Sequence, residues 1–129
     1  MKIIVDTNIF LAVVLNEPEK ENIIKLTAGS DIISPEILPY EIGNALSAMV
    51  KRKKITKREA LSTQGTANLI PVRLVEVNIS KALEIALKFN IYAYDAYFLQ
   101  TAQALSRPLM TLDKRMMQVA NEMNLEILE

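Results

Sequence analysis

Short apolar segments that alternate with longer helical patterns constrain the fold of this chain most. Residues 2–5, Lys-Ile-Ile-Val, have the β-branched pattern of a strand that is buried on both faces. The pattern predicts further strands at 73–77, 109–112 and 125–128, and helices at 80–89 and 94–105. Because strands alternate with helices, we expect an α/β fold in which a mainly parallel central sheet forms the middle of a three-layer α/β/α domain.

Local signals predict where several helices begin. Ser34-Pro35-Glu36 has the order of an N-cap, a proline at the first helical position and a first-turn acid, so a long helix is predicted from there to about Lys54. Thr56 and Glu59 have the spacing of a capping box, which predicts another helix that ends before Pro71. A helix is also expected directly after the first strand.

The composition excludes several classes of function. The chain has 129 residues and no repeat, low-complexity segment or flexible linker, so we expect a single domain over 1–129. Cysteine and histidine are absent, which excludes Ser-His-Asp catalysis and the usual zinc sites. Only three glycines are present, too few to favour a phosphate-binding glycine loop. No apolar run is long enough to cross a membrane, and we expect a soluble cytoplasmic protein.

Four acidic residues occupy informative places in this framework. Asp6 ends the first strand and Asp113 follows the strand at 109–112, and the carboxyl edge of a parallel sheet is where ligands bind. Asp95 falls in the first turn of its helix, and Glu41 lies one turn into the predicted long helix. Each residue alone has a simpler interpretation as a helix cap or a solvated acid. Together they place four carboxylates near one edge of the sheet.

Converging carboxylates repel one another unless a cation neutralises them. Oxygen ligands without His or Cys favour Mg²⁺ or Mn²⁺. Such an ion activates water and stabilises charge on a phosphodiester, which supplies a nucleophile in a chain without histidine.

Four segments then carry a resemblance to a known family. They are Ile3-Ile4-Val5-Asp6-Thr7-Asn8, Pro39-Tyr40-Glu41-Ile42-Gly43-Asn44-Ala45-Leu46, Tyr94-Asp95-Ala96-Tyr97-Phe98-Leu99-Gln100-Thr101-Ala102 and Met110-Thr111-Leu112-Asp113-Lys114-Arg115-Met116. In order and spacing they resemble the four acidic blocks of the PIN-domain family, most closely the toxins usually called VapC. The resemblance implies a small ribonuclease of a toxin–antitoxin pair that cuts RNA with Mg²⁺ or Mn²⁺, is blocked by a cognate antitoxin and forms a homodimer.

The resemblance also assigns residues. It makes Asp6, Glu41, Asp95 and Asp113 the catalytic and metal-binding acids, with Asn8 and Thr111 as supporting polar groups. Met116 and Met117 stand where some larger PIN nucleases carry further acids, so a tightly held second ion is not expected.

The overall charge does not point to a nucleic acid, because fifteen basic and fifteen acidic residues cancel. The strongest local charge is the basic run Lys51, Arg52, Lys53 and Lys54, followed by Lys57 and Arg58. This run either contacts the RNA backbone or only complements the end of a helix. The apolar content of 50% indicates surface that is covered by another subunit, which agrees with a homodimer.

Three alternatives stay open. Asp6-Thr7-Asn8 follows the first strand much as the Asp-x-Asp of haloacid dehalogenase-type phosphatases does, although Asn8 replaces the acid that protonates the leaving group. The chain could also be a catalytically silent PIN-like module that binds metal and a partner. A receiver domain is disfavoured because the acidic pair after the first strand is missing.

Overall fold

The computed structural model describes all 129 residues as a four-stranded sheet with seven helices. The elements in chain order are β1 (Lys2–Val5), α1 (Thr7–Val14), α2 (Lys20–Thr27), β2 (Asp31–Pro35), α3 (Leu38–Lys51), α4 (Lys57–Ala67), β3 (Arg73–Val75), α5 (Ile79–Phe89), α6 (Ala93–Leu105), β4 (Leu109–Met110) and α7 (Lys114–Glu122). None of the helices combines the length and hydrophobicity that crossing a membrane requires.

The sheet is entirely parallel, with strand order β3-β2-β1-β4. In the centre, β1 pairs with β2 on one side, where Ile3 lies opposite Ile32, and with β4 on the other, where Val5 lies opposite Met110. The chain therefore moves outward from β1 through β2 to β3 and then crosses to the far edge at β4. The strand order reverses at β1, and in open parallel sheets ligands bind beside the carboxyl ends of strands at such a point.

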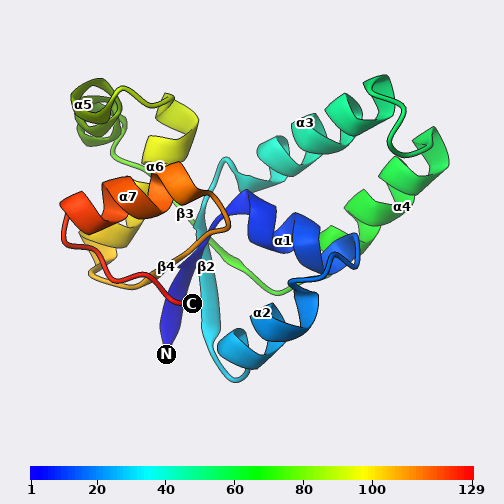
Figure 1. Cartoon of the computed structure of the whole chain (residues 1–129), viewed down its shortest axis with the longest axis horizontal. Coiled ribbons are helices and arrows are strands. Elements are labelled where there is room, and N and C mark those ends of the chain that lie inside the picture. The colour runs from blue at the N-terminus through cyan, green and yellow to red at the C-terminus, as the bar shows by residue number, and fades with distance from the viewer.

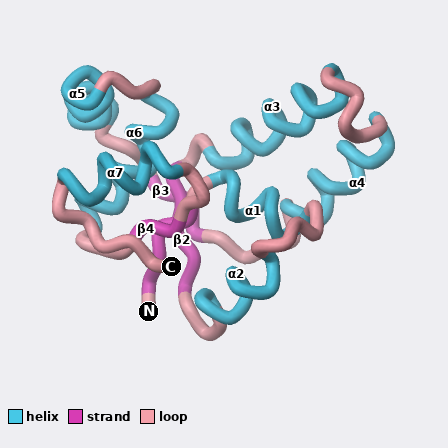
Figure 2. The backbone as a smooth tube through the Cα atoms, in the orientation of Figure 1, coloured by secondary structure: helices cyan, strands magenta, loops and turns pink.

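Helices cover both faces of the sheet (Figure 1). Side chains alternate along β1, so Ile4 joins a core with residues of α5, α6 and α7, whereas Ile3 and Val5 join a second core with α1, α2 and α3. Figure 2 shows the strands between these two groups of helices. The predicted α/β/α arrangement with a mainly parallel sheet is confirmed.

Helices α3 and α4 extend away from the sheet as an arm, at the upper right of Figure 1. Thr56 caps α4 with the predicted capping box: its Oγ1 accepts from the Glu59 backbone N–H at 3.1 Å, and the Glu59 carboxylate accepts from the Thr56 N–H at 3.1 Å. The basic run begins at Lys51, the last residue of α3, and its residues 52–54 lie in the exposed turn between the two helices.

The predicted helix start at Ser34 is wrong, because Ser34 and Pro35 are the last residues of β2. The Ser34 hydroxyl donates to the Val5 carbonyl at 2.6 Å, so it ties two strands together and caps no helix. Helix α3 begins at Leu38, with Pro39 in its first turn. Glu41 therefore also lies in the first turn of α3, earlier in its helix than the sequence predicted.

The other differences concern short elements. Helix α2, in which only Ile23 is buried, was not predicted from the sequence. Strands β3 and β4 end two residues earlier than predicted, at Val75 and Met110. The segment 125–128 forms an isolated bridge between Ile127 and Leu109 and no full strand.

Candidate active site

Four helix N-termini lie at the carboxyl edge of the sheet and its flanks, and each carries one of the four predicted acids. Asp6 is the N-cap of α1 and Asp113 is the N-cap of α7. Glu41 and Asp95 lie in the first turns of α3 and α6. The N-terminus of a helix carries partial positive charge, so each of these four positions attracts an anionic group.

Asp6 is the most buried of the four acids, with 5% of its surface exposed. Its backbone N–H donates to the Met110 carbonyl at 3.0 Å, which holds the end of β1 against the end of β4. Its Oδ1 accepts from the Thr7 backbone N–H at 2.7 Å, and its Oδ2 accepts from the Thr111 hydroxyl at 2.7 Å. Both carboxylate oxygens are therefore fixed in direction.

Thr111 and Asn8, the two supporting residues that the resemblance assigns, lie in the same network. The Thr111 Oγ1 accepts from the Asn8 Nδ2 at 3.3 Å and from the Asp113 backbone N–H at 3.1 Å. The Asn8 Oδ1 accepts from the Leu112 N–H at 3.1 Å. These contacts join the start of α1 to the loop between β4 and α7.

Thr7 belongs to the first of the four acidic segments, but no role was predicted for it from the sequence. Its hydroxyl donates to the Glu41 Oε2 at 2.7 Å, while its backbone N–H binds Asp6. One threonine thus holds two of the candidate acids. A hydroxyl directly after the first acid was the only sign of this contact in the sequence.

Asp113 also has a structural role. Its Oδ1 accepts from the backbone N–H groups of Arg115 at 2.8 Å and Met116 at 3.1 Å. Both bonds go to the same oxygen, so Oδ2 takes no part in the cap. The Arg115 side chain turns away and donates to the Phe89 carbonyl at 2.7 Å, and therefore does not neutralise the acids.

The electrostatics of the site show that these carboxylates repel one another. The pKa of Asp6 is raised from its ordinary 3.8 to about 7, mainly because burial removes water from the carboxylate. Hydrogen bonds from Thr111 and Thr7 act in the opposite direction, and the charges of Asp95 and Glu41 add to the rise.

Two further acids titrate above their ordinary range. Burial raises the pKa of Glu41; the Thr7 hydroxyl opposes this rise and Asp95 adds to it. Burial, followed by the charge of Asp113, raises the pKa of Asp95. Asp95 thus interacts with the other three acids, and no lysine or arginine side chain contributes to any of these shifts.

The donor set consists of oxygen atoms only, which is the chemistry that Mg²⁺ and Mn²⁺ prefer. No three acidic side chains converge closely enough to hold an ion in their present positions. Direct ligation by three or more of these carboxylates therefore requires side chains to move toward one another. Asp95 is only partly buried, which leaves its side chain room to move.

The remaining predicted features lie away from the acids. The basic run 51–54 is at the opposite end of α3 from Glu41, so a contact with nucleic acid there stays a prediction. Met116 is buried in the core with 1% exposure, and its Sδ lies 3.9 Å from the Thr111 Oγ1. Next to Thr111 the structure therefore has a buried methionine and no further acid.

Comparison with known proteins identifies the family. The family described as PIN domain matches residues 3–122, nearly the whole chain. Among curated proteins, no significant match is found.

Solved structures with a similar fold share little sequence with this chain. PAE2754 from Pyrobaculum aerophilum has a TM-score of 0.71 at 19% identity, over 92% of this chain and 79% of that one. VapBC2 from Rickettsia felis, bound to a DNA fragment from its promoter, has a TM-score of 0.65 at 19% identity, over 100% and 98%. FitAcB from Neisseria gonorrhoeae has a TM-score of 0.65 at 16% identity, over 98% and 96%. The similarity of fold agrees with the family match, and the chain belongs to the PIN domain family.

Proposed function

We propose that this protein is a metal-dependent endoribonuclease that cleaves RNA phosphodiester bonds with Mg²⁺ or Mn²⁺. The observation that carries the proposal is the group of four carboxylates at four helix N-termini, of which Asp6, Glu41 and Asp95 have pKa values raised by burial and by the charge of a neighbouring acid. Membership of the PIN domain family supports the same chemistry.

Asp6, Glu41, Asp95 and Asp113 would hold the ion. When bound there, the ion supplies positive charge for the phosphodiester and promotes ionisation of a water molecule. The Thr111 and Thr7 hydroxyls fix the directions of the Asp6 and Glu41 carboxylates, which is the role that hydrogen-bonding neighbours of metal ligands usually have. Because the chain has no histidine, proton transfer falls to these carboxylates and to water.

The phosphatase alternative fits the structure less well. Both polar ends of the Asn8 side chain are occupied, since Nδ2 donates to Thr111 and Oδ1 accepts from Leu112. Asn8 therefore joins two segments of the site, and its amide is too weak an acid to protonate a leaving group. The match to the PIN family also favours the nuclease.

We further propose that the protein is the toxin of a toxin–antitoxin pair, works in the cytoplasm and forms a homodimer. The structural neighbours include the VapBC2 and FitAcB complexes, which support an antitoxin partner. Exposed apolar side chains on α5, namely Leu83 and Leu87, support self-association, since an isolated chain gains nothing from exposing them to water.

The test is cleavage of single-stranded and structured RNAs by protein freed of any inhibitor, in Mg²⁺, in Mn²⁺ and in excess chelator. We expect cleavage with either ion and none in chelator. Asp113→Asn should lose activity by orders of magnitude, whereas Asp31→Asn, which changes an exposed acid at the start of β2, should keep it. Equal activity in chelator would contradict metal dependence. Folded, metal-binding protein that cleaves none of these RNAs would favour the silent PIN-like module.

A further inference from the structure

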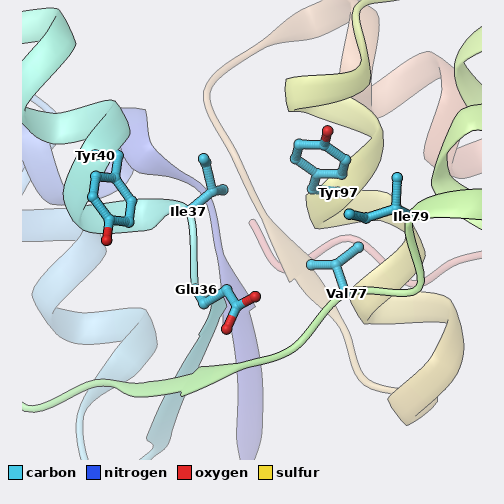
Figure 3. A pocket seen from close by; sticks show the side chains of 6 residues that line it. All are labelled: Glu36, Ile37, Tyr40, Val77, Ile79 and Tyr97. Atoms are coloured by element: carbon cyan, nitrogen blue, oxygen red, sulfur yellow. The ribbon is translucent and has the colours of Figure 1, made fainter.

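A cavity of about 460 Å³ opens between α3 and α6, and the proposed function gives it no role. Its lining residues are Glu36, Ile37, Tyr40, Val77, Ile79 and Tyr97 (Figure 3). This volume lies within the range of about 300 to 1,000 Å³ that is common for small-ligand pockets. Five of the six side chains are hydrophobic or aromatic, and the sixth is a carboxylate.

The cavity lies beside the candidate active site because the same two helices carry both. Tyr40 directly precedes Glu41 in the first turn of α3, and Tyr97 follows Asp95 in the same turn of α6. The charges of Glu41 and Asp95 interact across the space between these helices. The cavity and the acids therefore share the N-terminal parts of the same two helices, which is the basis for placing a base of a bound polynucleotide in the cavity.

The walls of the cavity suit a flat aromatic group. In Figure 3, Tyr40 and Ile37 form one wall, and Tyr97, Ile79 and Val77 form the other. The Tyr97 ring packs edge-to-face against Tyr94, with 6.1 Å between ring centroids, which restrains its orientation. Proteins that bind single-stranded nucleic acid commonly stack unpaired bases on such side chains.

The Glu36 carboxylate adds a polar requirement. Its backbone N–H is bound to the Val75 carbonyl at 2.9 Å, and Figure 3 shows its side chain between the two walls. A carboxylate only accepts hydrogen bonds, so it selects groups that donate. Guanine presents two adjacent donors, N1–H and the N2 amino group, along its Watson–Crick edge. Uracil presents one donor between two carbonyl oxygens, which a carboxylate repels.

We propose that this cavity is a nucleobase subsite that binds an unpaired guanine next to the cleaved bond, stacked on Tyr97 and read by Glu36. The proposal rests on the ribonuclease function proposed above and adds a sequence preference to it. Tyr97 and Glu36 are then specificity-determining residues, separate from the acids that would hold the metal.

The test measures binding of the four nucleoside 5′-monophosphates in Mg²⁺, so it does not depend on cleavage. Binding is followed by isothermal titration calorimetry, which gives a signal in variants that lack Tyr97 as well as in the wild-type protein. We expect GMP to bind at least about 10-fold more tightly than UMP, with AMP and CMP between them, because hydrogen bonds to a charged acceptor are the stronger kind.

Variants separate stacking from recognition of the base edge. Tyr97→Ala should lower the affinity for all four nucleotides by about 5- to 150-fold, and Tyr97→Phe should bind them as the wild-type protein does. Glu36→Gln should reduce the preference for GMP over UMP to within about 3-fold, because the amide adds a donor where guanine also donates. Tyr92→Ala removes an exposed tyrosine outside the cavity and is the matched control, with unchanged affinities.

Two results of the binding and oligomeric-state measurements would overturn the proposal. One is equal binding of the four nucleotides by the wild-type protein. The other is a change in oligomeric state in Tyr97→Ala with unchanged nucleotide binding, which would make the cavity a contact between protein chains. RNA cleavage without any base preference would remove the subsite and leave the ribonuclease function intact. A GMP preference in a protein that cleaves no RNA would support the subsite and contradict the ribonuclease function.

Discussion

Replacement of Asp6 by Asn should change the stability of the metal-free protein with opposite signs at high and low pH. The pKa of Asp6 is about 7 in the folded protein, against an ordinary 3.8. Between these values the folded state binds a proton more tightly than the unfolded chain, so the free energy of unfolding falls as the pH rises through this window. At about 1.4 kcal/mol per pH unit, the ionised carboxylate costs about 4 kcal/mol at pH 8.

Asn carries no charge and removes this cost. It also removes the acceptor for the Thr111 hydroxyl, since one carboxylate oxygen becomes an amide nitrogen, and an unpaired buried donor costs about 1 to 3 kcal/mol. The net result at pH 8 is a gain of about 2 kcal/mol in the free energy of unfolding. At pH 4, where the folded wild-type carboxyl is protonated, only the lost hydrogen bond remains, and the variant should be less stable by about 1 to 3 kcal/mol.

The assay is urea-induced unfolding, followed by circular dichroism in excess chelator at both pH values. Asp31→Asn, which neutralises an exposed carboxylate, serves as the control and should show no such reversal. A variant less stable than the wild type at pH 8 would refute the reasoning, because it would mean that burial and repulsion at Asp6 are small. With saturating Mn²⁺ the order at pH 8 should reverse, since an ion that binds only the folded wild type stabilises it by about 2.7 kcal/mol at a hundredfold excess over Kd.

Three further predictions concern other parts of the molecule. Thr7→Val keeps the shape of the side chain but removes the hydroxyl that donates to Glu41, so Mn²⁺ affinity and RNA cleavage should each fall by about 10-fold. Thr7→Ser should restore both. Unchanged values in Thr7→Val would show that Thr7 does not position Glu41. If the run 51–54 binds RNA, its replacement by alanines should make the slope of log K for RNA binding against log salt concentration shallower by about 0.7 for each phosphate that the run neutralises. An unchanged slope would mean that the run is only a solvated end of the helix. Light scattering at micromolar concentration should give twice the chain mass of 14.5 kDa, and Leu83→Glu on the exposed face of α5 should give the monomer; a monomeric wild type would contradict self-association.

The sequence predicted the fold class because its pattern is repeated over the whole chain. The buried run before Asp6 and the capping box at Thr56 both have a local physical cause, and both are found where predicted. Ser34 and Pro35 misled because a serine followed by a proline suits a helix start in any local window. Only the tertiary contact of the Ser34 hydroxyl with the Val5 carbonyl shows that this serine belongs to a strand.

The candidate site was predictable in its residues but not in its contacts. The ends of β1 and β4 had to meet at one edge of a parallel sheet, so the proximity of Asp6 to the loop that carries Asp113 followed from topology. The contact between Thr7 and Glu41 joins residues 34 positions apart in different helices, and no local pattern encodes it. The cavity at Glu36 and Tyr97 was missed for the same reason, since its residues come from separate elements.

The central claim is that the four carboxylates act together as the site of one divalent ion, and direct titration of the folded protein with Mn²⁺ tests it most simply. Asp95 is the informative position, because its charge interacts with those of the other three acids. We expect saturable Mn²⁺ binding by the wild-type protein and its loss in Asp95→Asn, with the far-UV circular dichroism unchanged. Absence of saturable binding in the wild type, or equal affinity in Asp95→Asn, would contradict the claim.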